Sequence, residues 1–504
     1  MFKWLDDFLN SITMYRLAVY GLLTILAYAV ILAFWGALFF TGPQLILSSG
    51  VLYLTCVSSN YLLSRLFKAQ TNVESSTITA LILSLILSPF TKPSEIFFLV
   101  LAGVLAMGSK YLLASNGKHI FNPAAISLLI LNLFGVGLSV WWVGSSIMLP
   151  VVSIVGLLIV RKLRRGHLFI TFVVFAIIMI LLTGINHGFA PKDLSVQLLT
   201  SWPVFYFGTI MLTEPMTTPP TKIPRLVYGA IVGLFFGASF RVGPIFSSPE
   251  FALVVGNLFS FLVGFKRRIV FTLESKVQLS PDTIEFVFIP NKEFSFLPGQ
   301  YVEWTLQHKR PDSRGNRRYF TIASSPTEEL VRICSKFSDK SSSFKKALKV
   351  LKVGDGIVGS QLDGEFVLPE DPDVKMVFIA GGVGITPFRS MIRSLLDTGQ
   401  QRWMILFYVN KLEDDIVYKE VFDEGKAAGL KTVYTLTDIV KVSEKWRGKV
   451  GYIDENMIKE EVPDYEDRVY YLSGPNMMVD LYKKLLMDMG IKQSEIKTDY
   501  FPGY

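Results

Sequence analysis

The stretch Lys375–Met391, KMVFIAGGVGITPFRSM, decides the fold of the C-terminal part of the chain. It begins with an apolar run, Met376 to Ala380, that is typical of a buried strand. A glycine turn follows, and then apolar residues at helical spacing. Strand, glycine turn and helix are how a doubly wound sheet presents a helix N-terminus to a phosphate. Thr386 is expected to cap the helix and Pro387 to lie in its first turn. Taken alone, such a turn is also compatible with a tight turn that binds nothing.

Two further motifs flank this turn in a fixed order. Arg318–Pro326 reads RYFTIASSP and precedes it, and Tyr471–Met478 reads YLSGPNMM and follows it. With these three motifs, residues from about 270 to 504 resemble a ferredoxin–NADP⁺ reductase-type module. The resemblance implies an antiparallel β-barrel that binds FAD, then an α/β domain with a parallel sheet that binds NADH or NADPH. It implies an NAD(P)H-dependent flavin oxidoreductase.

The residue pattern agrees with these two domains. Short β-rich runs separated by turns favour a small barrel in 270–368, and strands alternating with helical patterns favour a parallel sheet in 369–504. The expected strands are 270–274, 283–289, 301–306, 320–323, 331–335 and 356–360 in the first domain, and 375–380, 402–408, 431–436 and 468–473 in the second.

The resemblance assigns roles around the flavin. Arg318 neutralises the pyrophosphate, because a guanidinium suits phosphate oxygens. Phe320 stacks on the isoalloxazine, where relatives usually carry Tyr. Thr321 hydrogen-bonds the hydride-accepting N5 atom. Ser342 and Ser343 match a second phosphate-binding turn.

Simpler roles remain open for some of these residues. Ser342 and Ser343 are also good helix N-caps. Arg318 has cationic neighbours at 314 and 317, so its alternative role is that of a surface cation. The aromatic tail Tyr500–Tyr504 resembles tails that lie near the flavin, or it is a packed terminus.

The resemblance also assigns roles to residues around the nicotinamide. Ser473 occupies a position where many relatives carry Cys, and it offers a hydroxyl in place of a thiol. Met477 and Met478 are implied, with Gly474 and Pro475, to border the nicotinamide, and the alternative favoured for their side chains is a helix core. Catalytic roles are implied for Thr321, Phe320 and Ser473, and nicotinamide-nucleotide binding for Gly382, Gly384, Thr386, Pro387, Gly474 and Pro475.

The end of the second α/β strand, Phe407–Asp415, bears on the choice of coenzyme. NADPH-using enzymes need cations for the 2′-phosphate, and this segment holds Lys411 beside Glu413, Asp414 and Asp415. The composition favours NADH, with NADPH as the alternative.

The N-terminal part of the chain has a different composition. Half of the 504 residues are hydrophobic (51%), and mean hydropathy is +0.41. Apolar runs of membrane-spanning length recur between Tyr15 and Phe265, and an ordinary globular composition begins at Lys266. We expect about ten spans. They are 16–40, 44–66, 75–89, 95–114, 120–137, 140–160, 167–185, 194–213, 225–241 and 249–265.

The charges predict an orientation for these spans. With the N-terminus in the cytoplasm, most Lys and Arg between the spans fall inside, and only Lys92, Lys192 and Arg241 fall outside. The expected location is the inner (plasma) membrane, multi-pass, with the C-terminal module in the cytoplasm. The net charge of +8 is mostly juxtamembrane, so nucleic acid is not an expected partner.

Metal sites are not expected. The chain has two cysteines, Cys56 and Cys334, one in each half, so no disulfide framework or cysteine metal site is predicted. The histidines follow no pattern of haem-ligating helices. His119, His167 and His187 fall at span ends or in a loop and are expected to be solvated.

Three membrane stretches depart from plain apolar helices. They are Ser75–Pro89, rich in hydroxyls, Gly117–Ile126, which contains Asn-Pro, and Thr213–Thr221, TEPMTTPPT. Ser75–Pro89 forms the third span, and Thr213–Thr221 ends the eighth. These are the third spans of two halves of five spans each, which predicts an inverted repeat with a site at the interface between the two halves. The alternative is that Ser and Thr pack helices closely and Pro ends a span.

These stretches make residues 40–265 similar to the NqrB/RnfD family, the flavin-carrying membrane subunits of sodium-pumping NADH:quinone oxidoreductase and the Rnf complex. The resemblance implies a quinone or another acceptor and further electron-transfer subunits. The family's Ser-Gly-Ala-Thr-like FMN attachment motif is absent, so covalent FMN is not expected. The open alternatives are noncovalent FMN or riboflavin, a quinone, or haem held by His119, His167 or His187.

The combined prediction is a membrane flavoprotein with three domains, 1–265, 266–370 and 371–504. It passes electrons from NAD(P)H through FAD to a flavin or quinone in the membrane domain, or across the bilayer. The alternative is a redox-driven Na⁺/H⁺ transporter, for which Glu74 and Glu214 at span ends are the intramembrane carboxylates. A third alternative is a flavin or solute carrier with a regulatory reductase.

Overall fold

The structure is a computed structural model that divides into two compact units. The described residues are 12–67, 73–115, 118–136, 139–186, 188–200, 202–219, 221–263, 269–309, 316–339 and 341–499, with Leu5, Phe8, Leu9 and Asp312. The tail Tyr500–Tyr504 and His187 lie outside them. Each unit is described by itself.

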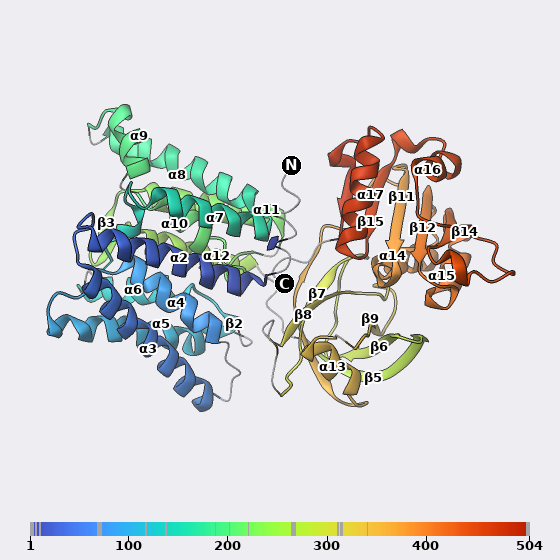
Figure 1. Cartoon of the computed structure of the whole chain (residues 1–504), viewed down its shortest axis with the longest axis horizontal. Helices are drawn as coiled ribbons and strands as arrows, with labels where there is room; N and C mark the ends of the chain where they lie inside the picture. Colours follow the sequence, from blue (N-terminus) through green and yellow to red (C-terminus); the bar gives the residue numbers. More distant parts are fainter. Residues whose placement is uncertain are drawn as a thin grey trace. The chain divides into compact units, whose positions relative to one another are not determined.

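The N-terminal unit is helical (Figure 1). A short hairpin precedes α6 (β1, Ala114–Ser115; β2, Lys118–His119), and a second precedes α12 (β3, Arg241–Val242; β4, Ile245–Phe246). The helices are α2 (Met14–Phe34), α3 (Gly42–Leu66), α4 (Val73–Ile86), η1 (Pro93–Glu95), α5 (Ile96–Leu112), α6 (Pro123–Leu133), η2 (Trp142–Gly144), α7 (Leu149–Leu163), α8 (Gly166–Asn186), α9 (Pro191–Thr200), α10 (Val204–Tyr206), the π-helix η3 (Phe207–Met211), α11 (Lys222–Gly237) and α12 (Pro249–Val263).

Four helical segments among the described residues are long and apolar enough to cross a membrane: α2, α3, Pro93–Leu112 and α8. Helical segments occur in every one of the predicted spans, but the others are shorter. The fifth span contains only α6, of 11 residues, because the hairpin ends just before the span at His119 and the helix begins only at Pro123. The eighth is broken into α9, α10 and η3. Helix length therefore supports membrane association and does not establish about ten spans.

The helices pack in the same pattern in two sets of five segments, when α9, α10 and η3 are taken together as the third segment of the second set. Within α2–α6, the second helix packs on the fourth (α3 on α5) and the fourth on the fifth (α5 on α6). From α7 to α12, α8 packs on α11 and α11 on α12 in the same way. The sets meet through their first helices, α2 and α7, and through their last, α6 and α12.

The contact between α8 and α11 depends on three glycines of α11. A Cβ added to Gly229, Gly233 or Gly237 would lie 3.1, 2.6 or 2.8 Å from a backbone oxygen of α8. Glycines four residues apart line one face of a helix and let two helix backbones approach closely, as in helices packed within membranes. Larger residues at these positions would push the two helices apart.

The first sheet of the C-terminal unit is antiparallel and has six strands, in the order β8-β7-β10-β5-β6-β9. Its edge strands, β8 and β9, form no ladder with each other, so the sheet is not a closed barrel in the described residues. One backbone hydrogen bond, from Ala323 N to Arg332 O at 2.8 Å, connects the segment after β8 to β9. The strands are β5 (Ile269–Ser280), β6 (Thr283–Pro290), β7 (Tyr301–Thr305), β8 (Arg317–Thr321), β9 (Val331–Lys336) and β10 (Gly356–Asp363), with α13 (Ser343–Val350) before β10.

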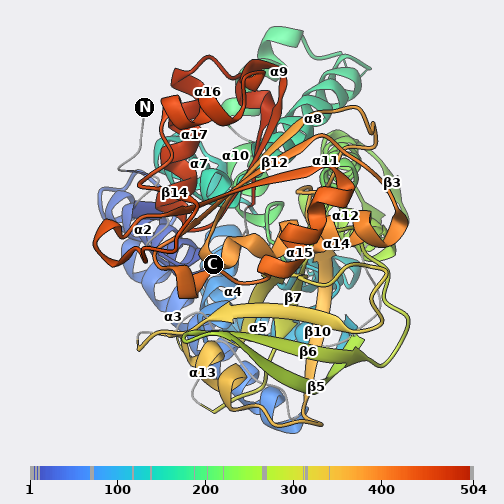
Figure 2. The ribbon, with the colours of Figure 1, turned by 90° about the vertical axis from the view of Figure 1, so that its right-hand side faces the viewer.

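The second sheet is parallel, as predicted, in the order β14-β13-β12-β11-β15-β16. Figure 2 shows α14 and α15 on one side of its strands and α16 and α17 on the other, and a hydrophobic core lies on each face. The strands are β11 (Met376–Gly381), β12 (Met404–Asn410), β13 (Leu430–Leu436), β14 (Lys449–Val450), β15 (Val469–Ser473) and β16 (Ile496–Thr498). The helices are η4 (Gly382–Ile385), α14 (Thr386–Thr398), η5 (Glu413–Asp415), α15 (Lys419–Glu424), η6 (Gly425–Ala428), α16 (Glu455–Glu461) and α17 (Asn476–Asp488), with short turns η7 (Ile439–Lys441), η8 (Tyr465–Asp467) and η9 (Gln493–Glu495).

Candidate active site and cofactor cradle

Strand β8 carries the residues predicted to hold the flavin. It pairs with β7, and Arg318 and Phe320 lie on one face of the strand because side chains alternate. Both side chains contact Phe344 on α13. The Phe320 and Phe344 ring centroids are 5.8 Å apart, and the Arg318 guanidinium carbon is 5.5 Å from the Phe344 centroid. Arg318 is buried, so its alternative role as a surface cation is wrong.

The N-terminus of α13 lies beside Arg318. Ser342 is the N-cap, and its hydroxyl accepts from Lys345 N at 3.3 Å. Ser343 N donates to Asp312 Oδ2 at 3.0 Å, and Arg318 Nη2 is 2.9 Å from Asp312 Oδ1. Asp312 therefore connects Arg318 on β8 with the N-terminus of α13, the two groups that the sequence predicts to bind phosphate.

The glycine turn and the Ser-Gly-Pro turn lie at neighbouring strand ends. Strands β11 and β15 are parallel neighbours, with Ala380 opposite Ser473. A Cβ on Gly384 would lie 2.4 Å from Ser473 O, and Gly474 has φ +155°. Gly382, with φ +52°, has open space around it. The turns leave room for a ligand at the carboxyl ends of the strands, where open α/β sheets bind nucleotides.

Two details of this region differ from the predictions. Thr386 is the first residue of α14 and not its cap; its Oγ1 donates to Val383 O at 3.2 Å, because the 3₁₀ turn η4 leads directly into the helix. Pro387 lies in the first turn as predicted. Met477 is 88% exposed and is not a core residue, whereas Met478 packs against the core that lines this face of the sheet.

One carboxylate connects the flavin and nicotinamide sides. Asp499 follows β16, which extends the sheet beside β15. Thr321 Oγ1 donates to Asp499 Oδ2 at 3.4 Å, and Ser473 Oγ donates to the same oxygen at 3.2 Å. The structure therefore brings together two of the predicted catalytic residues, and it does so through a residue that the sequence had not singled out.

Burial raises the pKa of Asp499 to about 7, although hydrogen bonds from Ser473 and Thr321 oppose the shift. Its other oxygen, Oδ1, is buried and has no hydrogen-bond partner among the described residues. At neutral pH the group can therefore gain or lose a proton, which suits acid–base chemistry.

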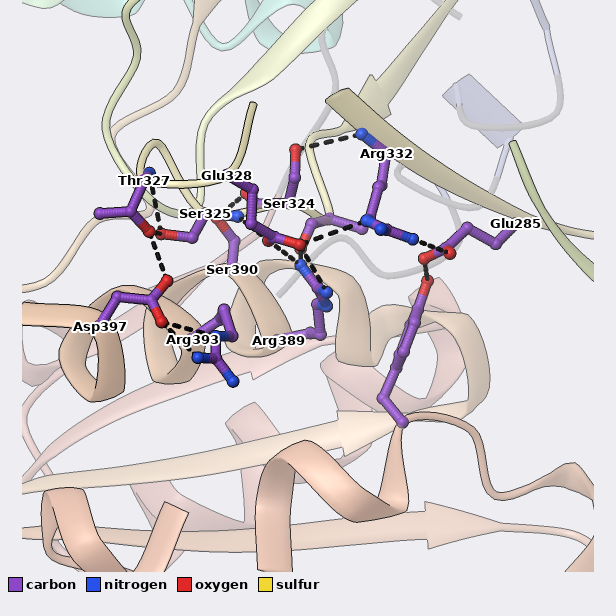
Figure 3. Close-up of polar contacts among 12 residues, drawn as sticks. Glu285, Ser324, Ser325, Thr327, Glu328, Arg332, Arg389, Ser390, Arg393 and Asp397 are labelled. Atoms are coloured by element: carbon purple, nitrogen blue, oxygen red, sulfur yellow. Dashed lines mark hydrogen bonds and ion pairs between the residues drawn. The ribbon is translucent and has the colours of Figure 1, made fainter. Parts of the chain in front are cut away.

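An ion-pair network links the two sheets (Figure 3). Arg389 on α14 donates through Nη2 to Glu328 Oε1 at 2.9 Å and through Nη1 to Ala323 O at 3.0 Å. Next to it, Ser390 Oγ donates to Ser324 O at 2.6 Å. These contacts hold α14, which follows the glycine turn, against the chain segment that follows β8. They fix the glycine turn relative to Thr321.

In the N-terminal unit, two of the three unusual stretches meet at Glu214. His119 Nε2 is 3.2 Å from Glu214 Oε1, and Asn122 Nδ2 donates to Oε2 at 2.9 Å. Thr217 Oγ1 donates to Oε2 at 3.1 Å. In the stretch at Ser75, Lys110 Nζ donates to Ser75 O at 3.1 Å. The prediction that His119 is solvated is wrong, because its side chain is 11% exposed.

No group of three or more His, Cys, Asp or Glu side chains in the described residues could hold a metal ion. Cys56 and Cys334 are both buried as free thiols. The residues of the C-terminal unit instead fit an organic dinucleotide. They offer a buried guanidinium beside a helix N-terminus, an aromatic ring, paired hydroxyls and a glycine cradle.

Residues 378–484 match the family described as an oxidoreductase NAD-binding domain. NADH-cytochrome b5 reductase 1 of Mortierella alpina is 30% identical over 227 residues, which are 44% of this chain and 74% of that protein. The chain belongs to the ferredoxin–NADP⁺ reductase family. Its C-terminal unit is therefore an NAD(P)H-dependent, FAD-binding oxidoreductase module.

Two further comparisons concern this same module. One subunit of the Na(+)-translocating NADH-quinone reductase of Haemophilus influenzae is 36% identical over 161 residues, 30% of this chain and 38% of that protein. The solved cytochrome P450 reductase GcoB of Amycolatopsis has a TM-score of 0.42 and 22% identity, covering 47% of this chain and 70% of that one. The chain spans between 28% and 60% of the length of several other relatives.

Proposed function

We propose that this chain is a membrane-bound oxidoreductase that passes electrons from NAD(P)H through FAD to an acceptor in its N-terminal unit. The observation that carries the proposal is the Thr321–Asp499–Ser473 arrangement, in which the flavin strand and the nicotinamide turn share one carboxyl group. In the part of the chain that the structure describes, four helical segments have membrane-spanning length. When bound, FAD accepts a hydride from NAD(P)H and releases the two electrons singly.

The residues of the C-terminal unit bind and orient the two cofactors. Arg318 and the α13 N-terminus, with Ser342 and Ser343, would hold the flavin pyrophosphate, Phe320 would stack on the ring, and the Thr321 hydroxyl would hydrogen-bond N5. Asp499 positions the Thr321 and Ser473 hydroxyls and can gain or lose a proton near neutral pH. The Arg389–Glu328 pair keeps the two domains at the separation that hydride transfer needs. Nicotinamide-nucleotide binding is proposed for Gly382, Gly384, Thr386, Pro387, Gly474 and Pro475.

For the N-terminal unit we propose an NqrB/RnfD-like membrane domain in residues 1–265, followed by an FAD domain in 266–370 and an NAD(P) domain in 371–504. The repeated packing of α2–α6 and α7–α12 supports an inverted repeat, since sets of five spans have opposite orientations. About ten crossings then return the chain to the cytoplasm, as the distribution of Lys and Arg also predicts.

The acceptor that we propose is a quinone or a noncovalent FMN or riboflavin in the membrane domain, with further electron-transfer subunits as partners. A redox-driven Na⁺/H⁺ transporter is the second candidate. The Glu214 site favours it, because ionisable pairs inside membrane domains mark ion or proton paths. Glu250, a carboxylate that no sequence pattern singles out, is fully buried and accepts from Trp141 Nε1 at 2.9 Å.

Two assays on one preparation separate these functions. Reduction of ferricyanide by NADH reports the C-terminal module, and reduction of a short-chain quinone reports transfer to the membrane domain. The proposal predicts both activities in detergent, with quinone reduction lost when residues 1–265 are deleted. Quinone reduction that survives this deletion would contradict an acceptor site in the N-terminal unit. Quinone reduction in sealed vesicles that acidifies one side, or depends on Na⁺, would favour the transporter.

A further inference from the structure

Asp312 occupies the centre of the predicted phosphate-binding site. Its carboxylate spans two donors, Arg318 Nη2 at 2.9 Å and Ser343 N at 3.0 Å. Its own backbone N–H donates to Ser343 Oγ at 2.9 Å, and His308 Nε2 is 3.0 Å from the same hydroxyl. Asp312 is therefore held at both its side chain and its backbone.

The two donors that Asp312 uses are the ones a phosphate group would use. A guanidinium and a backbone N–H in the first turn of a helix are the common partners of phosphate oxygens. Ser343 begins α13, so the positive end of the helix points toward the same place. The Asp312 carboxylate satisfies both donors with its two oxygens, as two oxygens of a phosphate would.

Because both are negatively charged, the Asp312 carboxylate and a phosphate group cannot occupy this site together. The site contains the Arg318 guanidinium, and the nearby Arg317 lies 3.6 Å from a different carboxylate, Glu303 Oε1. A pyrophosphate entering beside an ionised Asp312 would place several negative charges around one buried cation. Like charges at such separations repel strongly where water is excluded. The anionic cofactor must therefore displace the carboxylate.

We propose that Asp312 is an internal competitor of the flavin pyrophosphate, so that FAD binds by exchanging one anion for another at Arg318 and Ser343. The inference rests on the proposed flavin site. Its consequence is that the chain binds FAD less tightly than its donors allow, and that the returning carboxylate speeds FAD release. Asp312 thus sets the affinity for the cofactor and has no part in the chemical step.

The test compares Asp312→Asn with Asp282→Asn in the full-length protein in detergent. Asn keeps the size of the side chain and removes the charge that competes with phosphate. Asp282 is a matched control beside the same sheet, because it pairs with Lys336 at 3.0 Å instead of with Arg318 or Ser343. After removal of bound flavin, FAD is titrated and its fluorescence quenching gives Kd. Dilution of the loaded protein gives the rate of release.

Asp312→Asn should lower the Kd for FAD about tenfold, which is about 1.4 kcal/mol, and should slow release. Asp282→Asn should behave as wild type. An unchanged or higher Kd in Asp312→Asn would overturn the inference; a higher value would mean that Asp312 orients Arg318 for the phosphate. Arg318→Gln is measured alongside. If it too leaves Kd unchanged, the proposed flavin site itself fails; if it weakens binding while Asp312→Asn does not strengthen it, only this inference fails.

Inorganic pyrophosphate gives a second readout that does not need the flavin ring. It should raise the unfolding temperature of Asp312→Asn more than that of wild type, because the variant lacks the carboxylate that competes for the two donors. Equal shifts in the two proteins would contradict competition at this site.

Discussion

Asp499 accepts a hydrogen bond from Ser473 at 3.2 Å, and with the same oxygen it accepts one from Thr321. The first donor ends a strand of the parallel sheet and the second ends a strand of the antiparallel sheet. One carboxyl group therefore sets the distance between the proposed nicotinamide and flavin positions. Its pKa of about 7 means that its charge changes within the physiological range.

Asp499→Asn should lower kcat for NADH:ferricyanide reduction about tenfold to a hundredfold and leave KM for NADH nearly unchanged. Asn can still accept from both hydroxyls but cannot exchange a proton. The wild-type pH profile of kcat should therefore bend near pH 7, and that of the variant should not. Stopped-flow measurement of flavin reduction between about pH 5.5 and 8.5 brackets this pKa and makes the comparison. Retention of the bend in the variant would assign it to another group.

The same pKa predicts a dependence of stability on pH. The folded-state pKa of Asp499 is raised from 3.8 to about 7, so between these values the folded protein binds a proton that the unfolded chain does not. The contribution of this group to stability is present below about pH 4 and is lost as pH rises to about 7. Denaturant titrations of wild type and Asp499→Asn should converge at about pH 4 and should differ at about pH 8, with the variant more stable. A wild type that is at least as stable as the variant under the alkaline condition would contradict the raised pKa.

Removing one partner of the Arg389–Glu328 pair should weaken the contact between the two domains. Arg389 is 8% and Glu328 20% exposed, so Glu328→Gln leaves a mostly buried guanidinium without its counter-charge, at a cost of about 2–4 kcal/mol. Lys459→Ala breaks a solvent-exposed pair with Glu455 and should leave the stability nearly unchanged. Chemical denaturation measures both. Equal costs would show that the domain contact does not depend on this pair.

Gly384→Ala should raise KM for NADH about tenfold or more. The added Cβ would lie 2.4 Å from Ser473 O, a backbone atom, so the turn must shift by a distance that disturbs the nucleotide cradle. Gly356→Ala is the control, since its Cβ would meet the Val270 side chain at 3.3 Å and lies away from the turn. Flavin content, measured in both proteins, checks that the FAD domain stays intact. An unchanged KM in Gly384→Ala would remove Gly384 from the nucleotide site.

Glu214→Gln should reduce quinone reduction and leave ferricyanide reduction unchanged. The exchange removes the charge that His119, at 3.2 Å, faces inside the helical unit. Asp193→Asn is the control, because Asp193 is an exposed carboxylate on α9 of the same unit. Parallel loss of both activities in Glu214→Gln would indicate misfolding of the whole protein. Full quinone activity would exclude Glu214 from acceptor reduction.

Much of the C-terminal fold could be predicted because its signals are local. The run before the glycine turn is apolar and the motifs keep a fixed order, so the predicted bounds of β11 and β15 lie within one residue of the observed ones. Closure of the antiparallel sheet was not correctly predicted, because it depends on whether β8 and β9 meet across the sheet. Such a pairing joins residues on different strands, and the periodicity of apolar residues along the sequence does not show which strands pair.

Two residues of the site, Asp499 and Asp312, could not be predicted from the sequence because their roles also depend on non-local contacts. Asp499 follows a strand of only three residues at the end of the chain, and Asp312 lies in a charged segment before β8, so neither has a pattern around it. Each is assigned by contacts across more than one element. His119 was misjudged because its solvent exposure was inferred from its place at a span end, whereas Glu214, distant in sequence, buries it.

The most direct test of the account is an anaerobic titration of the purified full-length protein with NADH, followed by acid extraction and identification of the flavins. The account predicts FAD in every preparation, with its absorbance bleached by about one equivalent of NADH and restored by quinone. A protein that contains no FAD, or whose FAD is not bleached by NADH or NADPH, would contradict it.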